Sequence, residues 1–422
     1  MYKVYRLRNN LKFLSIPYKA TQATCVLILV KVGSKYEKKE LNGISHFLEH
    51  MLFKGTKKRP TQKEVAEVLD KIGGSYNGFT SEEYTGYYAK VSKGHLETAI
   101  DWVSDIFLNS IIPEKEVEKE RKVILEEINM YKDNPMAEVQ RLWRKVLYGD
   151  QPAGWDVIGT KESLQKIQRK NLINFMKRNY LAQNTLICVA GNFQEEKVRK
   201  LITKYFLNIQ KGQAPKKAKV VEKQKSPKVL LQQRDTQQTH LCIGTRAFSL
   251  FDKRRYALSL LAYILGGMMS SRLFVEIREK RGLGYYLSTN YEADPDAGYL
   301  ATSLGVDNQR VKEAIKIVVE EYKKIREKGI TSEELKKAKE YQKGKLALSL
   351  ESSDAQAFFY GVQYILRNKI YSLEEIYKKI DKVRESDILK VAREIFIPEK
   401  LNLVVVGPHK NKASFQTVLN CL

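Results

Sequence analysis

Cysteine is scarce in this sequence: there are four among 422 residues, far apart and without a Cys-x-x-Cys pair. This pattern excludes a disulfide framework and a zinc-thiolate site, and it favours a reducing compartment. Long apolar runs are also missing. The best candidate, Ala23–Val30, is long enough only for a strand, whereas a membrane span needs about 20 residues. Residues 1–10 are polar and basic and no apolar segment follows them, so we predict no signal peptide, no membrane partner and a cytoplasmic location.

The charges are unbalanced, with 74 lysines and arginines against 49 acidic residues, a formal net charge of +25. Such an excess can attract nucleic acid or acidic peptides. The lysines, however, alternate with glutamates over residues 114–122 and 333–345, and no compact basic block is interleaved with aromatic residues. We therefore expect a solvated surface and no nucleic-acid partner. The totals do not give the sign of any cavity wall.

The order of predicted elements occurs twice along the chain. A lysine-rich stretch with two prolines, residues 211–228, indicates a linker between the two occurrences. Gly86-Tyr87-Tyr88-Ala89 before it has a counterpart in Gly298-Tyr299-Leu300-Ala301 after it. The predicted strands are 2–7, 11–18, 24–32, 75–80, 84–91 and 185–190, then 228–234, 238–246, 285–293, 298–304 and 401–406, with helices between them. We predict an α+β protein with two duplicated domains, residues 1–210 and 229–422, each a mostly antiparallel sheet covered by helices.

Two of the five histidines stand four residues apart, at His46 and His50 in the sequence HFLEH. On a helix these two side chains share one face, and Glu49 lies beside them. Zinc suits two imidazoles and a carboxylate as protein ligands, with a fourth position left for water. The two histidines supply the imidazoles, so a third protein ligand must come from elsewhere in the chain. The alternative is a pair of surface histidines. Apolar neighbours such as Phe47 and Leu48 disfavour it, because they indicate a buried helix.

The residues around this motif resemble a known family. Residues 43–56, GISHFLEHMLFKGT, are similar to the zinc helix of the pitrilysin-like metallopeptidases, or inverzincins, whose inverted motif is His-x-x-Glu-His. Further segments resemble the same family: 77–81 (NGFTS), 118–127 (EKERKVILEE), 270–274 (SSRLF) and 278–285 (REKRGLGY). The resemblance covers essentially the whole chain. It is to the short two-domain type related to the beta subunits of mitochondrial processing peptidase, which implies half of a four-domain clamshell.

The resemblance implies a role for each matching residue. His46, His50 and Glu127 would bind one Zn²⁺ per chain, and the family spacing favours Glu127 over the adjacent Glu126. Glu49 would act as general base, while Glu120, two turns before Glu127, would hold a ligand histidine or support the metal-bound water. Substrate would be held by Arg278 and Tyr285, and by a strand containing Asn77, Gly78 and Phe79 to which the peptide adds.

The resemblance also implies assembly and function. Two chains would close the clamshell, with Arg278 and Tyr285 of one chain completing the zinc site of the other, as a homodimer or as a heterodimer with a degenerate paralogue. The predicted function is a zinc-dependent endopeptidase acting on peptides or unfolded polypeptides. The alternative is a non-catalytic structural subunit, against which the intact site residues argue. Residues 260–266, the counterpart of the zinc motif in the second half, contain no histidine or glutamate, so we expect one metal site per chain.

Overall fold

The computed structural model describes residues 2–419, which form two compact units. The first unit consists of the residues up to Ile128, Trp155–Ala218 and Ala347–Tyr371. The second consists of Asn129–Gly154, Lys219–Leu346 and the residues from Ser372 onward. The domains predicted from the sequence are each one continuous stretch of chain. The two units are not: the first includes Ala347–Tyr371 from the second half of the sequence, and the second includes Asn129–Gly154 from the first half.

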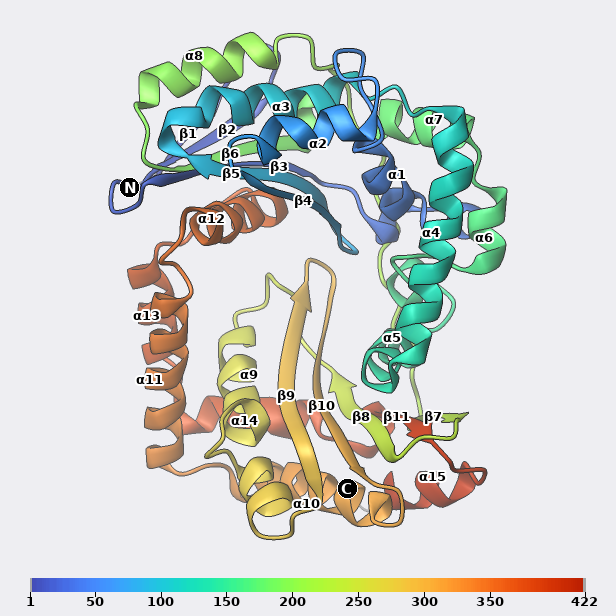
Figure 1. Ribbon diagram of the computed structural model, residues 1–422. Helices are drawn as coiled ribbons and strands as arrows, with labels where there is room; N and C mark the ends of the chain where they lie inside the picture. Colours follow the sequence, from blue (N-terminus) through green and yellow to red (C-terminus); the bar gives the residue numbers. More distant parts are fainter. Residues whose placement is uncertain (1, 420–422) are drawn as a thin grey trace. The chain divides into compact units, whose positions relative to one another are not determined.

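A six-stranded sheet forms the centre of the first unit, in the order β1-β2-β6-β3-β5-β4 (Figure 1). Its strands are β1 (Lys3–Arg6), β2 (Lys12–Pro17), β3 (Ala23–Val30), β4 (Ser75–Thr80), β5 (Thr85–Ser92) and β6 (Thr185–Gly191). Only β2 and β6 pair in parallel, and the other neighbouring pairs are antiparallel. Strand β4 pairs with β5 alone, so it lies at the edge of this sheet.

The second unit has a five-stranded sheet in the order β7-β11-β8-β10-β9. Its strands are β7 (Lys228–Gln233), β8 (Gln238–Arg246), β9 (Gly284–Asp294), β10 (Ala297–Asp307) and β11 (Leu401–Gly407). The pair β7 and β11 is parallel and the others are antiparallel. This order and these directions match β2-β6-β3-β5-β4, which confirms the predicted α+β class with duplicated domains.

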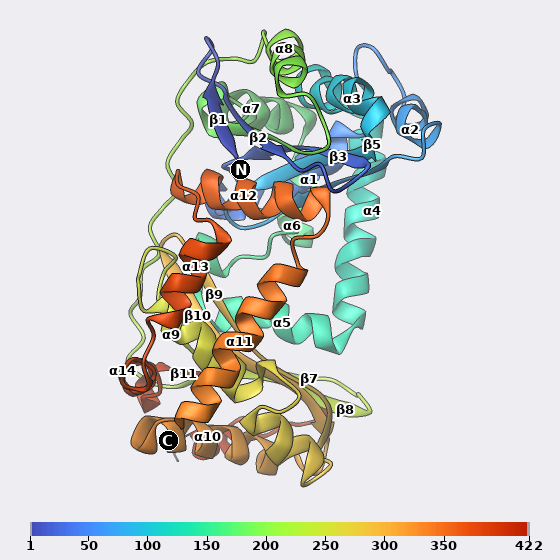
Figure 2. The same cartoon turned by 90° about the vertical axis from the view of Figure 1, so that its left-hand side faces the viewer.

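Helices cover both faces of each sheet (Figures 1 and 2). The helices drawn from the first half are α1 (Ile44–Leu52), α2 (Gln62–Asp70), α3 (Leu96–Asn109), α4 (Glu114–Asp133), α5 (Pro135–Tyr148), α6 (Lys161–Lys166), α7 (Arg169–Asn179) and α8 (Glu195–Tyr205). Those from the second half are α9 (Arg255–Ala262), α10 (Val311–Lys328), α11 (Ser332–Leu348), α12 (Ser353–Arg367), α13 (Leu373–Asp381), α14 (Glu385–Ile395) and α15 (Ala413–Leu419). The chain is extended at Ile167 and Gln168, which separates α6 from α7.

Each sheet is covered on one face by a helix from the other half of the sequence. In the first unit, Ala357 of α12 packs on the face of β3 that carries Leu27 and Leu29, while the opposite face of β3 packs with helices such as α3. In the second unit, Trp143 of α5 packs in one cluster with Cys242 of β8 and with Val404 and Val406 of β11. Because both faces of β3 are buried, its sequence is a continuous apolar run.

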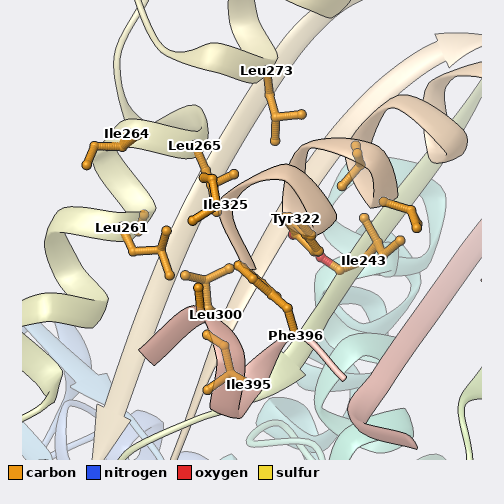
Figure 3. Close-up of a cluster of buried hydrophobic side chains, with 14 of the residues drawn as sticks. Ile243, Leu261, Ile264, Leu265, Leu273, Leu300, Tyr322, Ile325, Ile395 and Phe396 are labelled. Carbon is orange, nitrogen blue, oxygen red and sulfur yellow. The ribbon is translucent and has the colours of Figure 1, made fainter. Parts of the chain in front are cut away.

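The core of the second unit lies between its sheet and helices α9, α10 and α14. Leu300 and Ile243 of the sheet point toward Tyr322 and Phe396, whose rings stack with centroids 4.2 Å apart (Figure 3). The Tyr322 hydroxyl donates to the Ile243 carbonyl oxygen at 3.2 Å, so this buried polar group is satisfied.

The cysteines and the membrane prediction can be compared with this fold. Cys25, Cys188 and Cys242 are free and buried, and Cys421 lies outside the described residues. Among residues 2–419, no helix combines the length and the apolar character that a membrane crossing requires.

Candidate metal centre

Helix α1 carries both histidines of the motif, and its first turn is fixed by a buried carboxylate. Glu37 accepts hydrogen bonds from the backbone N–H groups of Gly43 and Ser45, at 2.7 and 2.8 Å, and from the Asn42 side chain at 2.8 Å. Burial raises the pKa of Glu37 to about 7, although these hydrogen bonds act in the opposite direction. Gly43 has a φ of +94°, and a Cβ there would lie 2.6 Å from the Ile158 carbonyl oxygen. The entry into α1 therefore requires glycine.

The two faces of α1 have different neighbours. Phe47, Leu48 and Met51 are fully buried in the core of the first unit. The other face presents the His46 and His50 side chains, which are 13% and 21% exposed, toward α4. The 3.6-residue repeat of the helix thus places both imidazoles together above an apolar support.

Three donor atoms converge at this face. The Nε2 atoms of His46 and His50 are 3.3 Å apart, and Glu127 Oε2 of α4 lies 3.8 and 3.7 Å from them, respectively. Two ligands of a tetrahedral zinc ion, each about 2.0–2.1 Å from the metal, are separated by about 3.4 Å. The three residues therefore fit a zinc ion and leave its fourth position open. Among the described residues, no other group of three or more such side chains meets the same distance limit.

The predicted choice between two adjacent glutamates can be compared with this geometry. Glu127 is half-buried and belongs to the three-residue group, whereas Glu126 is exposed. The structure therefore brings together His46, His50 and Glu127, which sequence reasoning placed in one site.

Glu120 contacts the Nδ1 side of the His50 ring. Its Oε1 is 2.8 Å from His50 Nδ1, and its Oε2 is 2.6 Å from Lys54 Nζ. Such a contact holds the proton of His50 on Nδ1 and leaves Nε2 free to accept a metal. Burial works against a charged His50, but the hydrogen bond to Glu120 and the charges of the nearby carboxylates outweigh it, so the pKa of His50 is raised.

His46 is in a different electrostatic environment. Burial, followed by the neighbouring His50, lowers the pKa of His46 to about 3. Its imidazole is therefore neutral at pH 7, which is the form that binds a metal. The Nδ1 atom of His46 is buried without a hydrogen-bond partner among the described residues.

Arg121 anchors α4 beside α1. Its guanidinium donates to the carbonyl oxygen of Leu164 and, at 2.8 Å, to that of Ile167 at the end of α6. The guanidinium carbon also lies 5.5 Å from the centre of the Phe47 ring. These contacts fix the rotation of α4, on which the positions of Glu120 and Glu127 depend. Sequence reasoning assigned Arg121 no role, since only tertiary contacts distinguish it from other arginines on helix surfaces.

Glu49 lies on α1 between the two histidines and is only 8% exposed. Thr80 Oγ1 of β4 donates to Glu49 Oε2 at 2.6 Å. Burial raises the pKa of Glu49, and the Thr80 hydrogen bond opposes this rise. A Cβ at Gly78 would lie 2.8 Å from Glu49 Cγ, so the absence of a side chain there lets β4 approach α1. Thr80 was missed by sequence reasoning, although strand alternation places it on the same face as Gly78.

The three residues predicted to receive a peptide all lie in the edge strand β4. Asn77 is exposed and accepts from the Gly78 backbone N–H at 2.9 Å. Phe79 points to the opposite face of the sheet from Thr80 and packs against Phe358 of α12, with ring centroids 5.1 Å apart. An edge strand has backbone groups available for pairing with a further chain.

Arg278 and Tyr285 belong to the second unit. Arg278 lies in a π-helical turn, Phe274–Glu279, and Tyr285 lies near the start of β9. The guanidinium carbon of Arg278 is 5.2 Å from the centre of the Tyr285 ring, and Tyr285 is 76% exposed. The two predicted substrate-side residues are therefore neighbours.

Comparison with known proteins agrees with the HxxEH motif and this fold. Residues 12–161 match the sequence profile described as Insulinase (Peptidase family M16), and residues 166–341 match the profile described as Peptidase M16 inactive domain. A relative from Bacillus subtilis named "Uncharacterized zinc protease YmxG" is 35% identical over 98% of this chain and 100% of its own length. The chain belongs to peptidase family M16.

Other members of family M16 extend this comparison. The relative named "Uncharacterized zinc protease Rv2782c", from Mycobacterium tuberculosis, is 33% identical over 96% of this chain and 92% of its own length. The crystal structure of a protease from Helicobacter pylori is 25% identical and superposes with a TM-score of 0.91, covering 97% of this chain and 99% of that one. The family and the fold predicted from the motifs are thereby confirmed, and the relatives' names indicate zinc proteases.

Proposed function

We propose that this chain is a zinc-dependent endopeptidase that hydrolyses peptides or unfolded polypeptides. The observation that carries the proposal is the triangle of His46 Nε2, His50 Nε2 and Glu127 Oε2, with a buried carboxylate, Glu49, on the same helix. When bound, zinc lowers the pKa of its water to about 7 and polarises the scissile carbonyl.

The chain's own residues supply the proton transfers and the positioning. Glu49 takes the proton of the attacking water and delivers it to the leaving amine. Its pKa, raised by burial, suits a group that must both accept and return a proton. Glu120 holds the His50 ring in place through Nδ1. Asn77, Gly78 and Phe79 present the edge of β4, where a substrate backbone can pair as an added strand.

The decisive experiment replaces Glu49 by glutamine in purified protein. We expect about one zinc per chain in the wild type and in Glu49→Gln, as Glu49 is not one of the three donors, but a loss of peptide cleavage of at least about a hundredfold in the variant. Glu126→Gln, on the exposed face of α4, serves as the control and should cleave normally. Equal cleavage by Glu49→Gln would refute the assigned mechanism. Zinc binding without any cleavage by the wild type would favour the non-catalytic subunit.

We also propose that the working enzyme is a homodimer in which Arg278 and Tyr285 of one copy face the substrate held by the other. The adjacency of these two residues in the second unit supports a joint role. Mixing two inactive variants, Glu49→Gln and Arg278→Ala, tests this: exchange of subunits should restore part of the activity, because some sites then contain both intact halves. No recovery after demonstrated subunit exchange would contradict the shared site.

A further inference from the structure

A cavity adjoins the metal centre within the first unit. It has a volume of about 750 Å³ and lies between the region after α1, the start of α2 and the start of α4. Pro60, Ala66 and Pro113 contribute apolar surface to its wall. The charged side chains that line it are those of Lys54, Lys63, Lys115, Lys119, Glu114 and Glu116. Its volume is in the range of cavities that bind small ligands or a few side chains.

The lysines of this cavity, which we call the lysine pocket, are only partly neutralised. Lys119 pairs with Glu116 at 2.6 Å, and Glu114 is 4.0 Å from Arg169. In contrast, Lys63 and Lys115 have no carboxylate within 4.0 Å among the described residues. The pocket therefore has a net positive wall with two cations available to a ligand.

The lysine pocket is connected to the metal centre by one short chain of contacts. Lys54 lines the pocket, its Nζ lies 2.6 Å from Glu120 Oε2, and Glu120 Oε1 lies 2.8 Å from His50 Nδ1. An extended peptide advances about 3.3 Å per residue. Successive side chains of an extended substrate therefore lie at multiples of this distance from the cleaved bond, and Lys54 is the residue that the pocket shares with the support of His50.

We propose that the lysine pocket binds acidic side chains of the substrate and makes this peptidase selective for peptides with glutamate or aspartate near the cleaved bond. This inference rests on the proposed function and adds a substrate class to it. Lys63 and Lys115 provide the charges, while the apolar wall accommodates the methylene groups of a glutamate. The positive wall also disfavours lysine or arginine at the same substrate positions, so attraction and repulsion both contribute to selectivity.

Cleavage of matched peptides tests the selectivity. A quenched fluorescent peptide of fixed sequence is prepared with glutamate, glutamine or lysine at each position around its centre. We expect the wild type to prefer the glutamate peptide over the glutamine peptide by about three- to tenfold in kcat/KM at one or more of these positions, mainly through KM. The preference should shrink as salt is added, because exposed charges are screened.

The double variant Lys63→Gln/Lys115→Gln should lose this preference and still cleave the glutamine peptide normally. The control is Lys197→Gln/Lys200→Gln on α8, which removes the same net charge from exposed positions of the first unit outside the pocket; it should keep the preference. A preference retained by the first variant, or lost equally in both, would overturn the lysine pocket as the selective site.

A binding measurement separates this inference from the proposed function. Fluorescence anisotropy with the zinc-loaded Glu49→Gln protein reports binding of the glutamate peptide without any cleavage. We expect the glutamate peptide to bind more weakly when the substitutions Lys63→Gln and Lys115→Gln are introduced into the Glu49→Gln protein. If the wild type cleaves all the peptides equally and this binding is unchanged, the pocket inference fails while the peptidase stands. If no peptide is cleaved but the lysine-dependent binding remains, the peptidase fails and the acidic-peptide site stands.

Discussion

Replacing Thr80 by valine removes the one hydrogen bond from β4 to the proposed general base while keeping the shape of the side chain. Thr80 Oγ1 donates to Glu49 Oε2 at 2.6 Å, and Glu49 is only 8% exposed. A hydrogen bond to a charged group contributes about 1.5–3 kcal/mol. If that contribution is lost when Glu49 must be aligned with the attacking water, kcat falls by about 10- to 150-fold.

The assay should separate this effect from general damage. Thr80 is not one of the three residues of the donor group, so zinc content should be unchanged. A loss confined to the reaction step leaves KM near the wild-type value. Thr80→Ser keeps the hydroxyl and should recover most of the activity. Thr85→Val is the matched control: Thr85 pairs opposite Thr80 in β5, but its hydroxyl donates to the Val32 carbonyl oxygen. An unchanged kcat in Thr80→Val, or an equal loss in Thr85→Val, would refute the positioning role.

Two further predictions concern the metal and the pH dependence of stability. Glu127→Gln should weaken zinc binding by more than about 10- to 100-fold, the loss typical of removing a residue that only supports a ligand. Glu126→Gln should bind zinc normally. Titration against a chelating dye measures both affinities, and equal values would exclude Glu127 as a ligand. Burial raises the pKa of Glu37 from 4.5 to about 7, so between these values the folded chain binds more protons than the unfolded chain and its stability falls as pH rises. Relative to Glu37→Gln, the metal-free wild type should lose about 2–3 kcal/mol of unfolding free energy between about pH 5 and about pH 8. Parallel pH profiles of the two proteins in urea unfolding would contradict the raised pKa of Glu37.

Local patterns were sufficient where the chemistry lies within one element. The four-residue spacing of His46 and His50 requires only a helix to bring their rings together. The predicted strand 75–80 has the same bounds as β4. The duplicated order of strands was also visible, because each half repeats the same succession of strands and helices. The composition of residues 211–228 predicts a linker between the halves.

Other features depend on contacts between distant segments. The exchange of α5 and α12 between the units has no local signal, because an amphipathic helix does not specify which sheet covers its apolar face. Likewise, only the packing of β4 against α1 shows that Thr80 donates to Glu49, and only the opening between α2 and α4 shows that the lysine pocket has two unpaired cations.

The sequence by itself identified the family, through the segments that resemble it. It also predicted the duplicated α+β fold and the pairing of the two histidines, since these follow from spacing and periodicity. The tertiary structure decided how Glu120, Glu127 and Thr80 approach those histidines and Glu49, and which lysines line the adjoining cavity. The physical reason is that hydrogen bonds and metal ligation depend on atoms a few ångströms apart. For residues far apart in the chain, that proximity is set by how the helices and the sheet pack around a common core.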